Sequence, residues 1–161
     1  MKENYLESVK EEFLHFKVIA ERAMMQCPDR KLFVQSNEES NSIATIVKHI
    51  SGNMISRWTD FLTSDGEKEW RNRDGEFEND IQTRKELLKC WDKGWDRFLL
   101  TLNSLTGDDL DKIILIRKEK LTVAEAINRQ LAHYCYHIGQ IVLLAKMHST
   151  DWKSLTIPRK K

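Results

Sequence analysis

The segment from Asn128 to Lys146, NRQLAHYCYHIGQIVLLAK, constrains the fold of this chain more than any other. It contains no proline and no charged residue between Arg129 and Lys146, and its apolar residues recur at helical spacing. This pattern predicts a long and largely buried helix. Its two histidines, His133 and His137, are four residues apart, so they lie on one face of the helix, one turn from each other. Two imidazoles so placed can bind one metal ion, but they make only half a site, and another part of the chain must supply at least one more ligand.

Three other segments show the same helical periodicity of apolar residues. In the first, apolar residues alternate three- and four-residue steps, and Pro28 ends the segment because proline disfavours a helical residue before it. The sequence Thr122-Val-Ala-Glu125 forms a capping box that opens the last helix, which contains the two histidines. We expect helices over residues 3–26, about 42–62, about 80–105 and about 122–147.

Four amphipathic segments without a convincing sheet predict an all-α fold, a four-helix bundle. The link between the second and third helices is long enough to run the length of the bundle, since an extended chain reaches about 3.3 Å per residue. It could therefore be a long crossover that joins two parallel middle helices in an up-down-down-up order. Residues 110–120 hold the one β-like piece, for which we expect a short extended segment or hairpin. The length of the chain indicates a single domain over residues 1–161.

The charge of the chain is nearly balanced, with a formal net charge of +1. This composition gives no reason to expect nucleic acid or an anionic membrane as a partner. No apolar run approaches the roughly 18 residues of a spanning helix, and the N-terminus lacks the apolar core of a signal peptide. The three cysteines, Cys27, Cys90 and Cys135, form no CxxC pair and are odd in number, which favours reduced thiols and a cytoplasmic location.

A third histidine, His49, lies on the flank of the apolar stripe of the second predicted helix. It is about 10 Å from the start of that helix, and His137 is about 15 Å from the end of its own, at 1.5 Å per residue. If the two helices are antiparallel neighbours, the two side chains reach a similar level. A lone histidine in such a place is usually structural, so the case for His49 as a ligand depends on the other two histidines lacking a partner.

Three neutral imidazoles suit Zn²⁺, Ni²⁺, Fe²⁺ or Cu²⁺. Such a site leaves positions open for water or substrate, which is typical of catalytic rather than structural metal sites. Gln140, three residues after His137, could support a ligand or contact a substrate. A helical zinc protease would need a glutamate directly after the first histidine, where this chain has Tyr134, so we set that function aside. No residue is assigned a catalytic role.

The segment from Thr63 to Phe77, TSDGEKEWRNRDGEF, is dense in charge and contains two aromatic residues. A merely solvated loop has little use for a tryptophan, so we expect this loop to fold over the metal end of the bundle with Trp70 in the pocket wall. Arg71 or Arg73 could then meet an anionic group on a substrate, because arginine binds carboxylates in a bidentate way. The alternative is a solvated crossover loop with no bearing on the site.

A histidine early in a second helix, followed by H-x3-H-x-G-Q-I in a fourth, resembles the DinB/YfiT-like metalloprotein superfamily. The blocks SIATIVKHI…RW, TVAEAINRQLAHYCYHIGQIVLLAK and LTIPRKK carry this resemblance over most of the chain, and TSDGEKEWRNRDGEF resembles an uncharacterised bacterial subfamily represented in bacilli. The resemblance implies an up-down-down-up bundle, frequent homodimers and a divalent metal held by three histidines, which map to His49, His133 and His137. Some relatives are thiol-dependent transferases or isomerases that use bacillithiol, mycothiol or glutathione, and others have no known activity.

Three functions remain open at this stage. The first is a metal-dependent enzyme, most concretely an S-transferase that activates a low-molecular-weight thiol and directs it at an electrophilic small-molecule substrate, with Zn, Ni or Fe as the metal. The second is a metal-dependent hydrolase, for which a loop carboxylate such as Glu67 or Asp74 would have to serve as base. The third is a non-enzymatic protein that binds a metal or a small ligand.

The first predicted helix has more apolar surface than one bundle core requires. The residues outside its main seam are Tyr5, Leu14, Val18, Ile19 and Met24. Such an excess commonly marks an interface, so we expect a homodimer through a helical face.

Overall fold

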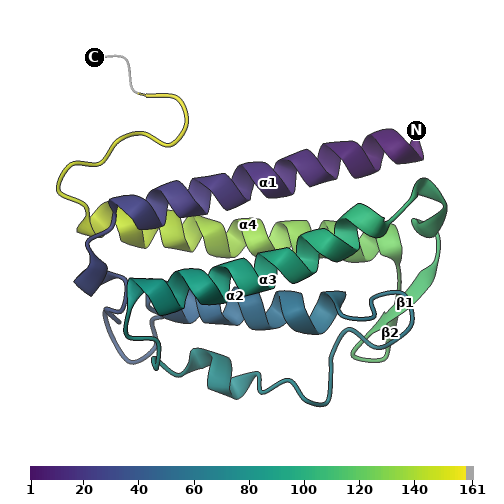
Figure 1. Cartoon of the computed structure of the whole chain (residues 1–161), viewed down its shortest axis with the longest axis horizontal. Helices are drawn as coiled ribbons and strands as arrows, with labels where there is room; N and C mark the ends of the chain where they lie inside the picture. The colour runs from purple at the N-terminus through teal and green to yellow at the C-terminus, as the bar shows by residue number, and fades with distance from the viewer. Residues whose placement is uncertain (159–161) are drawn as a thin grey trace.

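The computed structural model describes residues 1–158, and residues 159–161, which end the LTIPRKK block, lie outside the described part. Four long helices and one small antiparallel sheet make up the fold (Figure 1). They are α1 (Lys2–Gln26), α2 (Ile43–Trp58), α3 (Arg84–Ser104), β1 (Ile113–Ile116), β2 (Glu119–Thr122) and α4 (Val123–His148). Short 3₁₀ turns lie at η1 (Asp29–Lys31), η2 (Asp74–Phe77) and η3 (Gly107–Asp109). The expected all-α fold is therefore confirmed in outline, with one small hairpin at the β-like piece.

Helices α3 and α4 each begin directly after a capping threonine. Thr83 before α3 and Thr122 before α4 each form a capping box with the glutamate three residues later, which satisfies backbone N–H groups that have no partner within the helix. Two predicted boundaries were wrong by a turn. The third helix starts after Thr83 rather than near residue 80, and the second ends at Trp58 because Asp60 adopts a positive φ of 48° that a helix cannot accommodate.

Helices α2 and α3 lie side by side and run in the same direction. The Ser51 hydroxyl donates to the Cys90 carbonyl, and further along both helices the Thr101 hydroxyl donates to the Trp58 carbonyl. Two contacts in the same order along both helices require parallel directions. The segment between them, residues 59–83, must therefore return along the length of α2.

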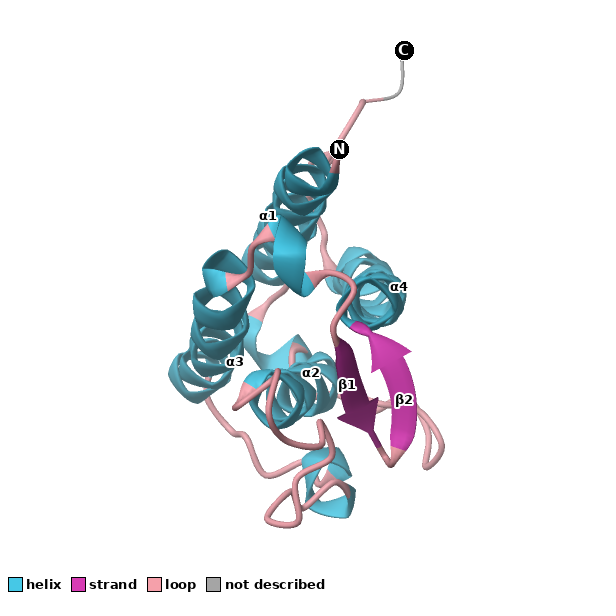
Figure 2. Ribbon diagram, turned by 90° about the vertical axis from the view of Figure 1, so that its right-hand side faces the viewer, coloured by secondary structure: helices cyan, strands magenta, loops and turns pink. Residues whose placement is uncertain are grey.

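Helix α4 packs against both α1 and α2 (Figure 2). Near the start of α1, the Tyr5 hydroxyl donates to Asn128 near the start of α4. The order is reversed between α2 and α4, because Trp58 at the end of α2 donates its Nε1–H to the Tyr134 hydroxyl, whereas His49 lies beside His137, farther along α4. This antiparallel pair brings residues from the middle of each helix to one level.

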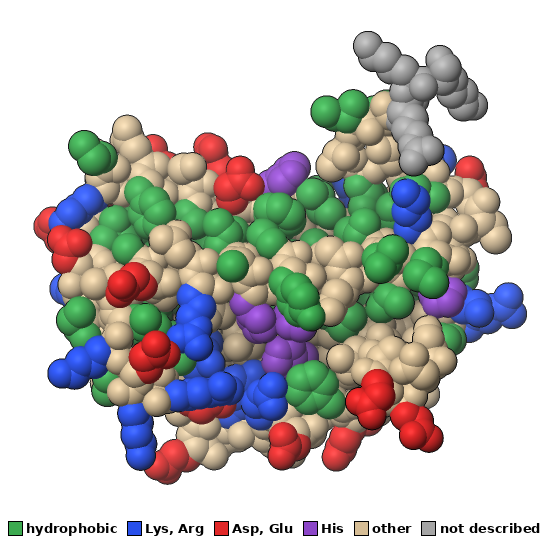
Figure 3. Space-filling model, turned by 180° about the vertical axis from the view of Figure 1, so that it is seen from behind, with side chains coloured by type: hydrophobic (Ala, Val, Ile, Leu, Met, Phe, Trp, Pro, Cys, Tyr) green, Lys and Arg blue, Asp and Glu red, His purple; other side chains and the backbone are tan. Residues whose placement is uncertain are grey.

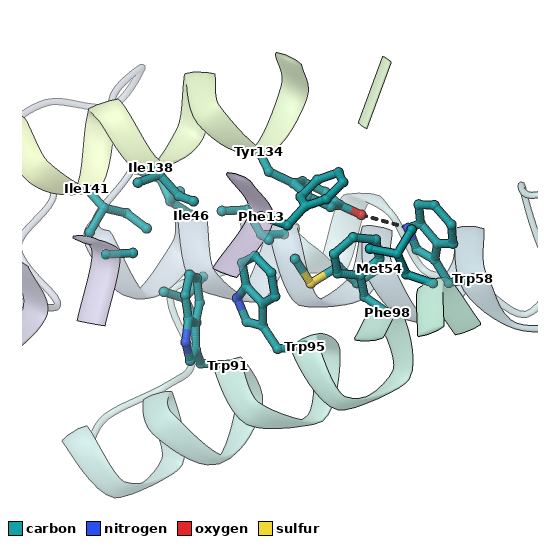
Figure 4. Close-up of a cluster of buried hydrophobic side chains, with 14 of the residues drawn as sticks. Phe13, Ile46, Met54, Trp58, Trp91, Trp95, Phe98, Tyr134, Ile138 and Ile141 are labelled. Atoms are coloured by element: carbon teal, nitrogen blue, oxygen red, sulfur yellow. Dashed lines mark hydrogen bonds between the residues drawn. The ribbon is translucent and has the colours of Figure 1, made fainter. Parts of the chain in front are cut away.

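Aromatic side chains from all four helices fill the centre of the core (Figure 4). Phe13 of α1 meets Phe98 of α3 edge to face, with ring centroids 4.5 Å apart, a geometry that adds to the apolar burial. The buried aromatic residues are Phe13, Trp58, Phe61, Trp91, Trp95, Phe98 and Tyr134. Met24, expected on the outer surface of the first helix, is instead buried in this core. Among residues 1–158, no helix combines the length and the apolar sequence that crossing a bilayer requires.

The β1–β2 hairpin is tied to the long link between α2 and α3. Its turn residues, Arg117 and Lys118, both have positive φ, and their backbone N–H groups donate to the two carboxylate oxygens of Asp65. The Gly66 N–H donates to the Leu115 carbonyl, so the link adds a further backbone contact to the hairpin. These bonds hold the beginning of the link in place before it passes along α2.

Gly94 allows α2 and α3 to approach closely, which makes it a test of this packing. A Cβ there would lie 2.7 Å from the Ser51 Cα, a backbone atom that cannot move aside alone. We expect Gly94→Ala to lower the free energy of unfolding by about 1–3 kcal/mol through overpacking, despite the better helix propensity of alanine. Gly139→Ala is the matched control, because among residues 1–158 a Cβ added there would meet no atom within 4 Å outside the nearby backbone of its own helix. It should leave the protein equally stable or up to about 1 kcal/mol more stable. Urea unfolding of both variants measures the difference, and equal stabilities would contradict the close packing.

Candidate metal centre

Three histidines from two helices meet near the middle of one face of the molecule. His49 comes from α2, and His133 and His137 come from successive turns of α4. Their ring centroids are 4.7 to 5.5 Å apart, and one nitrogen of each ring lies within 4.8 Å of the others. Figure 3 shows histidine side chains gathered in the centre of this face, beside a group of lysine and arginine side chains. The three residues singled out from the sequence are thus brought together, and the cluster can hold a metal ion.

Two of the three rings have the tautomer that a metal ligand needs. The Nδ1 of His49 lies 3.0 Å from a Glu76 carboxylate oxygen, and the Nδ1 of His137 lies 2.8 Å from the Gln140 amide oxygen. Because both partners are acceptors, each Nδ1 donates its hydrogen, which leaves the lone pair on Nε2. Metal-bound histidines in proteins almost always have such a second bond, which fixes the orientation of the ring.

The spacing of the ligand atoms also fits one ion. The Nε2 atoms of His133 and His137 are 3.1 Å apart. Two nitrogens bound to one tetrahedral Zn²⁺ at about 2.05 Å would be about 3.3 Å apart. Residues on the same helix face, one turn apart, therefore place their ring nitrogens at nearly the distance that a shared ion demands.

Burial keeps the pair on α4 uncharged. Burial, together with the nearby His137 and His49, lowers the pKa of His133 to about 3. Burial also lowers the pKa of His137, although its bond to Gln140 acts in the opposite direction. Both imidazoles are neutral at neutral pH, which is the form that binds a metal.

The loop before α3 supplies the carboxylate that orients His49. Glu76 lies in η2, and burial alone would raise the pKa of its carboxyl group, but hydrogen bonds from His49 and Arg71 lower it, so it is ionised. The Arg71 guanidinium donates from Nε and Nη2 to both Glu76 oxygens, at 2.7 and 2.8 Å. Gly52 makes room for this carboxylate, since a Cβ there would lie 2.2 Å from a Glu76 oxygen.

Aromatic and basic side chains of the same loop lie over the histidines. The Phe77 ring stacks on the His49 ring with centroids 4.9 Å apart. The Arg73 guanidinium lies 5.4 Å from the centre of the Phe77 ring, a favourable cation–π arrangement. The end of the segment 63–77 thus packs on the histidine cluster, and Arg71 and Arg73 line the pocket beside it.

Trp70 and Gln140, both expected at the substrate pocket, do not line it. Trp70 is 60% exposed and lines a separate depression with residues of α2 and α3, so its expected place beside the histidines is corrected. The reason is that Arg71 points inward to Glu76, and the preceding side chain faces outward. Gln140 bonds to His137 and does not line the pocket next to His49 and His133.

A small basic pocket adjoins the histidines. It has a volume of about 210 Å³ and is lined by His49, Asn53, Arg57, Arg71, Arg73, Arg117, Arg129, Gln130 and His133. Reasoning from the sequence missed Glu76, Arg57 and Gly52, which shape this region. Glu76 lies in a loop whose path the sequence leaves open, and Arg57 reads as an ordinary surface residue near a helix end. The one signal was a glycine three residues after His49, which permits close approach on that face.

Among known proteins, the chain matches one family. The chain matches the family described as "Protein of unknown function (DUF1572)" over residues 1–161. No curated protein and no solved structure matches it. The match spans the whole sequence, and the chain therefore belongs to the DUF1572 family, which is a DinB-like family.

Proposed function

We propose that this protein is a divalent-metal-dependent enzyme whose metal, Zn, Ni or Fe, is held by His49, His133 and His137. The observation that supports this most is the convergence of three imidazoles, two of which have their other nitrogen bonded to Glu76 or Gln140. Three ligands leave positions for water or substrate, as in catalytic sites. A bound divalent ion would supply a Lewis acid that lowers the pKa of a thiol or water beside it.

We further propose that the four helices form the up-down-down-up bundle of DinB-like proteins, with residues 59–83 as its long crossover. The parallel directions of α2 and α3 and the antiparallel directions of α2 and α4 support this arrangement. The TSDGEKEWRNRDGEF block supports placement in the bacilli-type subfamily.

The reaction we favour is the transfer of a low-molecular-weight thiol to an electrophilic small molecule. The thiol loses its proton to solvent, its sulfur forms a bond to the electrophilic carbon, and the leaving group departs with the bonding electron pair. In this reaction Glu76 and Gln140 orient the histidines, and Phe77 shields one side of His49 from water. Among residues 1–158, no acidic side chain lines the pocket next to His49 and His133, which suits an anionic nucleophile.

The two alternatives have less support. A hydrolase needs a free carboxylate as base, but Glu76 is bonded to His49 and Arg71, and Glu67 is paired with three arginines. Asp74, the other carboxylate considered, is exposed on the loop. A non-enzymatic protein that carries a metal or a ligand would use the same metal ligands. Addition of a thiol to the cobalt-substituted protein distinguishes it from a thiol transferase.

Metal content tests the ligand set directly. We expect purified protein to contain one divalent ion per chain by elemental analysis, and we expect His49→Ala and His133→Ala to lose most of it, because each removes one of three ligands. His15→Ala is the matched control, since His15 is exposed on α1 outside the cluster, and it should retain full metal. Full stoichiometric metal in His49→Ala would show that the ligand set is wrong.

Spectroscopy of a cobalt-substituted protein tests the thiol reaction. Adding a low-molecular-weight thiol to the Co²⁺ form should change the d–d bands and add a sulfur-to-metal charge-transfer band, because a thiol enters an open position. The corresponding alcohol, with oxygen in place of sulfur, is the control and should leave the spectrum unchanged. An unchanged spectrum with saturating thiol would favour the hydrolase or the non-enzymatic alternative.

We also propose a homodimer through the face formed by α1 and α4. These helices pack together, and they expose Leu14, Val18, Tyr136 and Leu143 to solvent. In Figure 3 hydrophobic side chains form a band along this part of the molecule. A contiguous band of apolar side chains commonly marks an interface.

Sedimentation measures this association. We expect the protein to sediment as a dimer at micromolar concentration and Val18→Lys to shift it towards the monomer, because a buried charge opposes association. Leu100→Lys, an equally drastic change at an exposed position of α3, should leave the dimer intact. Wild-type protein that is monomeric at micromolar concentration would rule out the dimer.

A further inference from the structure

The pocket beside the histidines has an unusual excess of positive charge. In the part of the chain that the structure describes, five arginines and no acidic residue line this pocket. They come from four parts of the chain. Arg57 lies near the end of α2, Arg71 and Arg73 lie in the crossover loop, Arg117 lies in the hairpin turn, and Arg129 lies in α4. Such convergence of like charges is unfavourable unless something compensates for it.

The carboxylates nearby compensate for only part of this charge. Glu67 is shared by three arginines, Arg57, Arg71 and Arg117, at distances of 3.0 to 3.3 Å. Glu76 pairs with Arg71, and Glu119 pairs with Arg129. Asp65 is also close, but backbone N–H groups of residues 67, 117 and 118 occupy its oxygens.

Arg57 is the residue whose bonding is least complete. It is only 5% exposed, and among residues 1–158 its Nε and Nη1 have no hydrogen-bond partner. Burial, with the like charges of Arg71 and Arg117, lowers its pKa from the usual value although Glu67 acts in the opposite direction. A charged donor that is buried without a partner destabilises the folded state. A further acceptor next to Arg57 would remove this cost.

A second buried polar side chain, that of Gln130, lines the same pocket. It is buried in α4, one turn before His133, and its amide oxygen has no partner among the described residues. Rotation of the amide would present its NH₂ group to an acceptor instead. Arg57 thus offers charged donors as it stands, and Gln130 would add a neutral donor from another helix once its amide is turned.

We propose that this pocket binds an oxyanion, the carboxylate or phosphate group of a small-molecule ligand, with Arg57 as its buried partner. A guanidinium presents paired N–H groups that match the geometry of both oxyanions, and such charge-assisted bonds are stronger than neutral ones. The volume of about 210 Å³ is below the roughly 300 Å³ at which pockets for whole ligands begin, so it suits one end of a molecule.

The pocket lies directly beside the three histidines, which suggests how it would position a ligand. His49 and His133 belong both to its lining and to the metal cluster, so a ligand anchored there by an oxyanion has its remaining part next to the three histidines. The oxyanion site would therefore orient a substrate and select anionic ones. This inference concerns binding alone and does not depend on the thiol reaction or on the identity of the metal.

Binding of simple anions tests the proposal. The melting temperature of purified protein, and of protein stripped of metal by a chelator, is measured against the concentration of inorganic phosphate or acetate, with ionic strength kept constant by chloride. A ligand that binds only the folded state raises the melting temperature, and the dependence on ligand concentration gives its apparent Kd.

Two variants test the site. Arg57→Lys keeps the positive charge but loses the paired N–H donors. Arg129→Gln removes a charge at the more exposed rim of the pocket, so we expect this variant to fold normally. Arg22→Gln, an exposed arginine of α1, is the matched control for loss of charge.

We expect saturable stabilisation by at least one of the two anions, and an apparent Kd raised at least about tenfold in Arg57→Lys, the loss typical of a charged hydrogen bond. A smaller rise should follow in Arg129→Gln and none in Arg22→Gln. Stabilisation by acetate alone identifies a carboxylate as the natural group, and stabilisation by phosphate alone identifies a phosphate. The proposal fails if neither anion stabilises wild-type protein. It also fails if Arg57→Lys and Arg129→Gln both bind as wild type does, because the anion would then sit elsewhere, for example on the metal.

Discussion

The bidentate pair between Arg71 and Glu76 is the interaction on which the site depends. The Arg71 side chain is 2% exposed, and its partner Glu76 also bonds to His49, so one chain of contacts runs from the crossover loop to α2. Removing one member of a buried ion pair costs about 3–5 kcal/mol, because the other is left charged and unpaired. The pair therefore fixes the loop against the helix more firmly than loop contacts usually do. It also holds the carboxylate that sets the tautomer of His49, so the packing of the loop and the orientation of this ring are coupled.

A second carboxylate extends this arrangement to the hairpin. Glu67 bonds to Arg57 of α2, Arg71 of the loop and Arg117 of the hairpin turn. Asp65 binds the backbone of the same turn through two N–H groups, which a two-residue turn with positive φ leaves pointing outward. The hairpin is too short to be stable alone, since isolated two-stranded hairpins are marginal in water. Its contacts with the crossover loop explain why a small sheet forms in a chain that is otherwise helical.

The sequence predicted the helices and the histidine cluster well because both depend on local spacing. Apolar periodicity and capping boxes located four helices, and the four-residue spacing of His133 and His137 placed them on one face. The family match agrees with the DinB-like resemblance at the level of the family. Side-chain directions in the loop could not be predicted in the same way, because no periodicity governs them. Trp70 was expected inside since it is apolar, yet the buried position belongs to Arg71, whose charge is satisfied by two glutamates that a one-dimensional pattern does not bring together.

The arginines around the histidines have two opposite effects on the binding of a cation. Neutral imidazoles are needed to bind a cation, and burial, with smaller contributions from Arg57 and Arg71, lowers the pKa of His133 and keeps this ring neutral. The same arginines repel a divalent cation. Glu76 offsets this, because its ionised carboxylate accepts a hydrogen bond from His49, one of the three candidate ligands, and places negative charge beside the cluster. Negative charge is thus placed behind His49, and positive charge faces the open pocket, where an oxyanion would approach. The crossover loop contributes to both charges, because it carries Glu76 as well as Arg71 and Arg73, while α2, the hairpin turn and α4 supply the other arginines of the pocket.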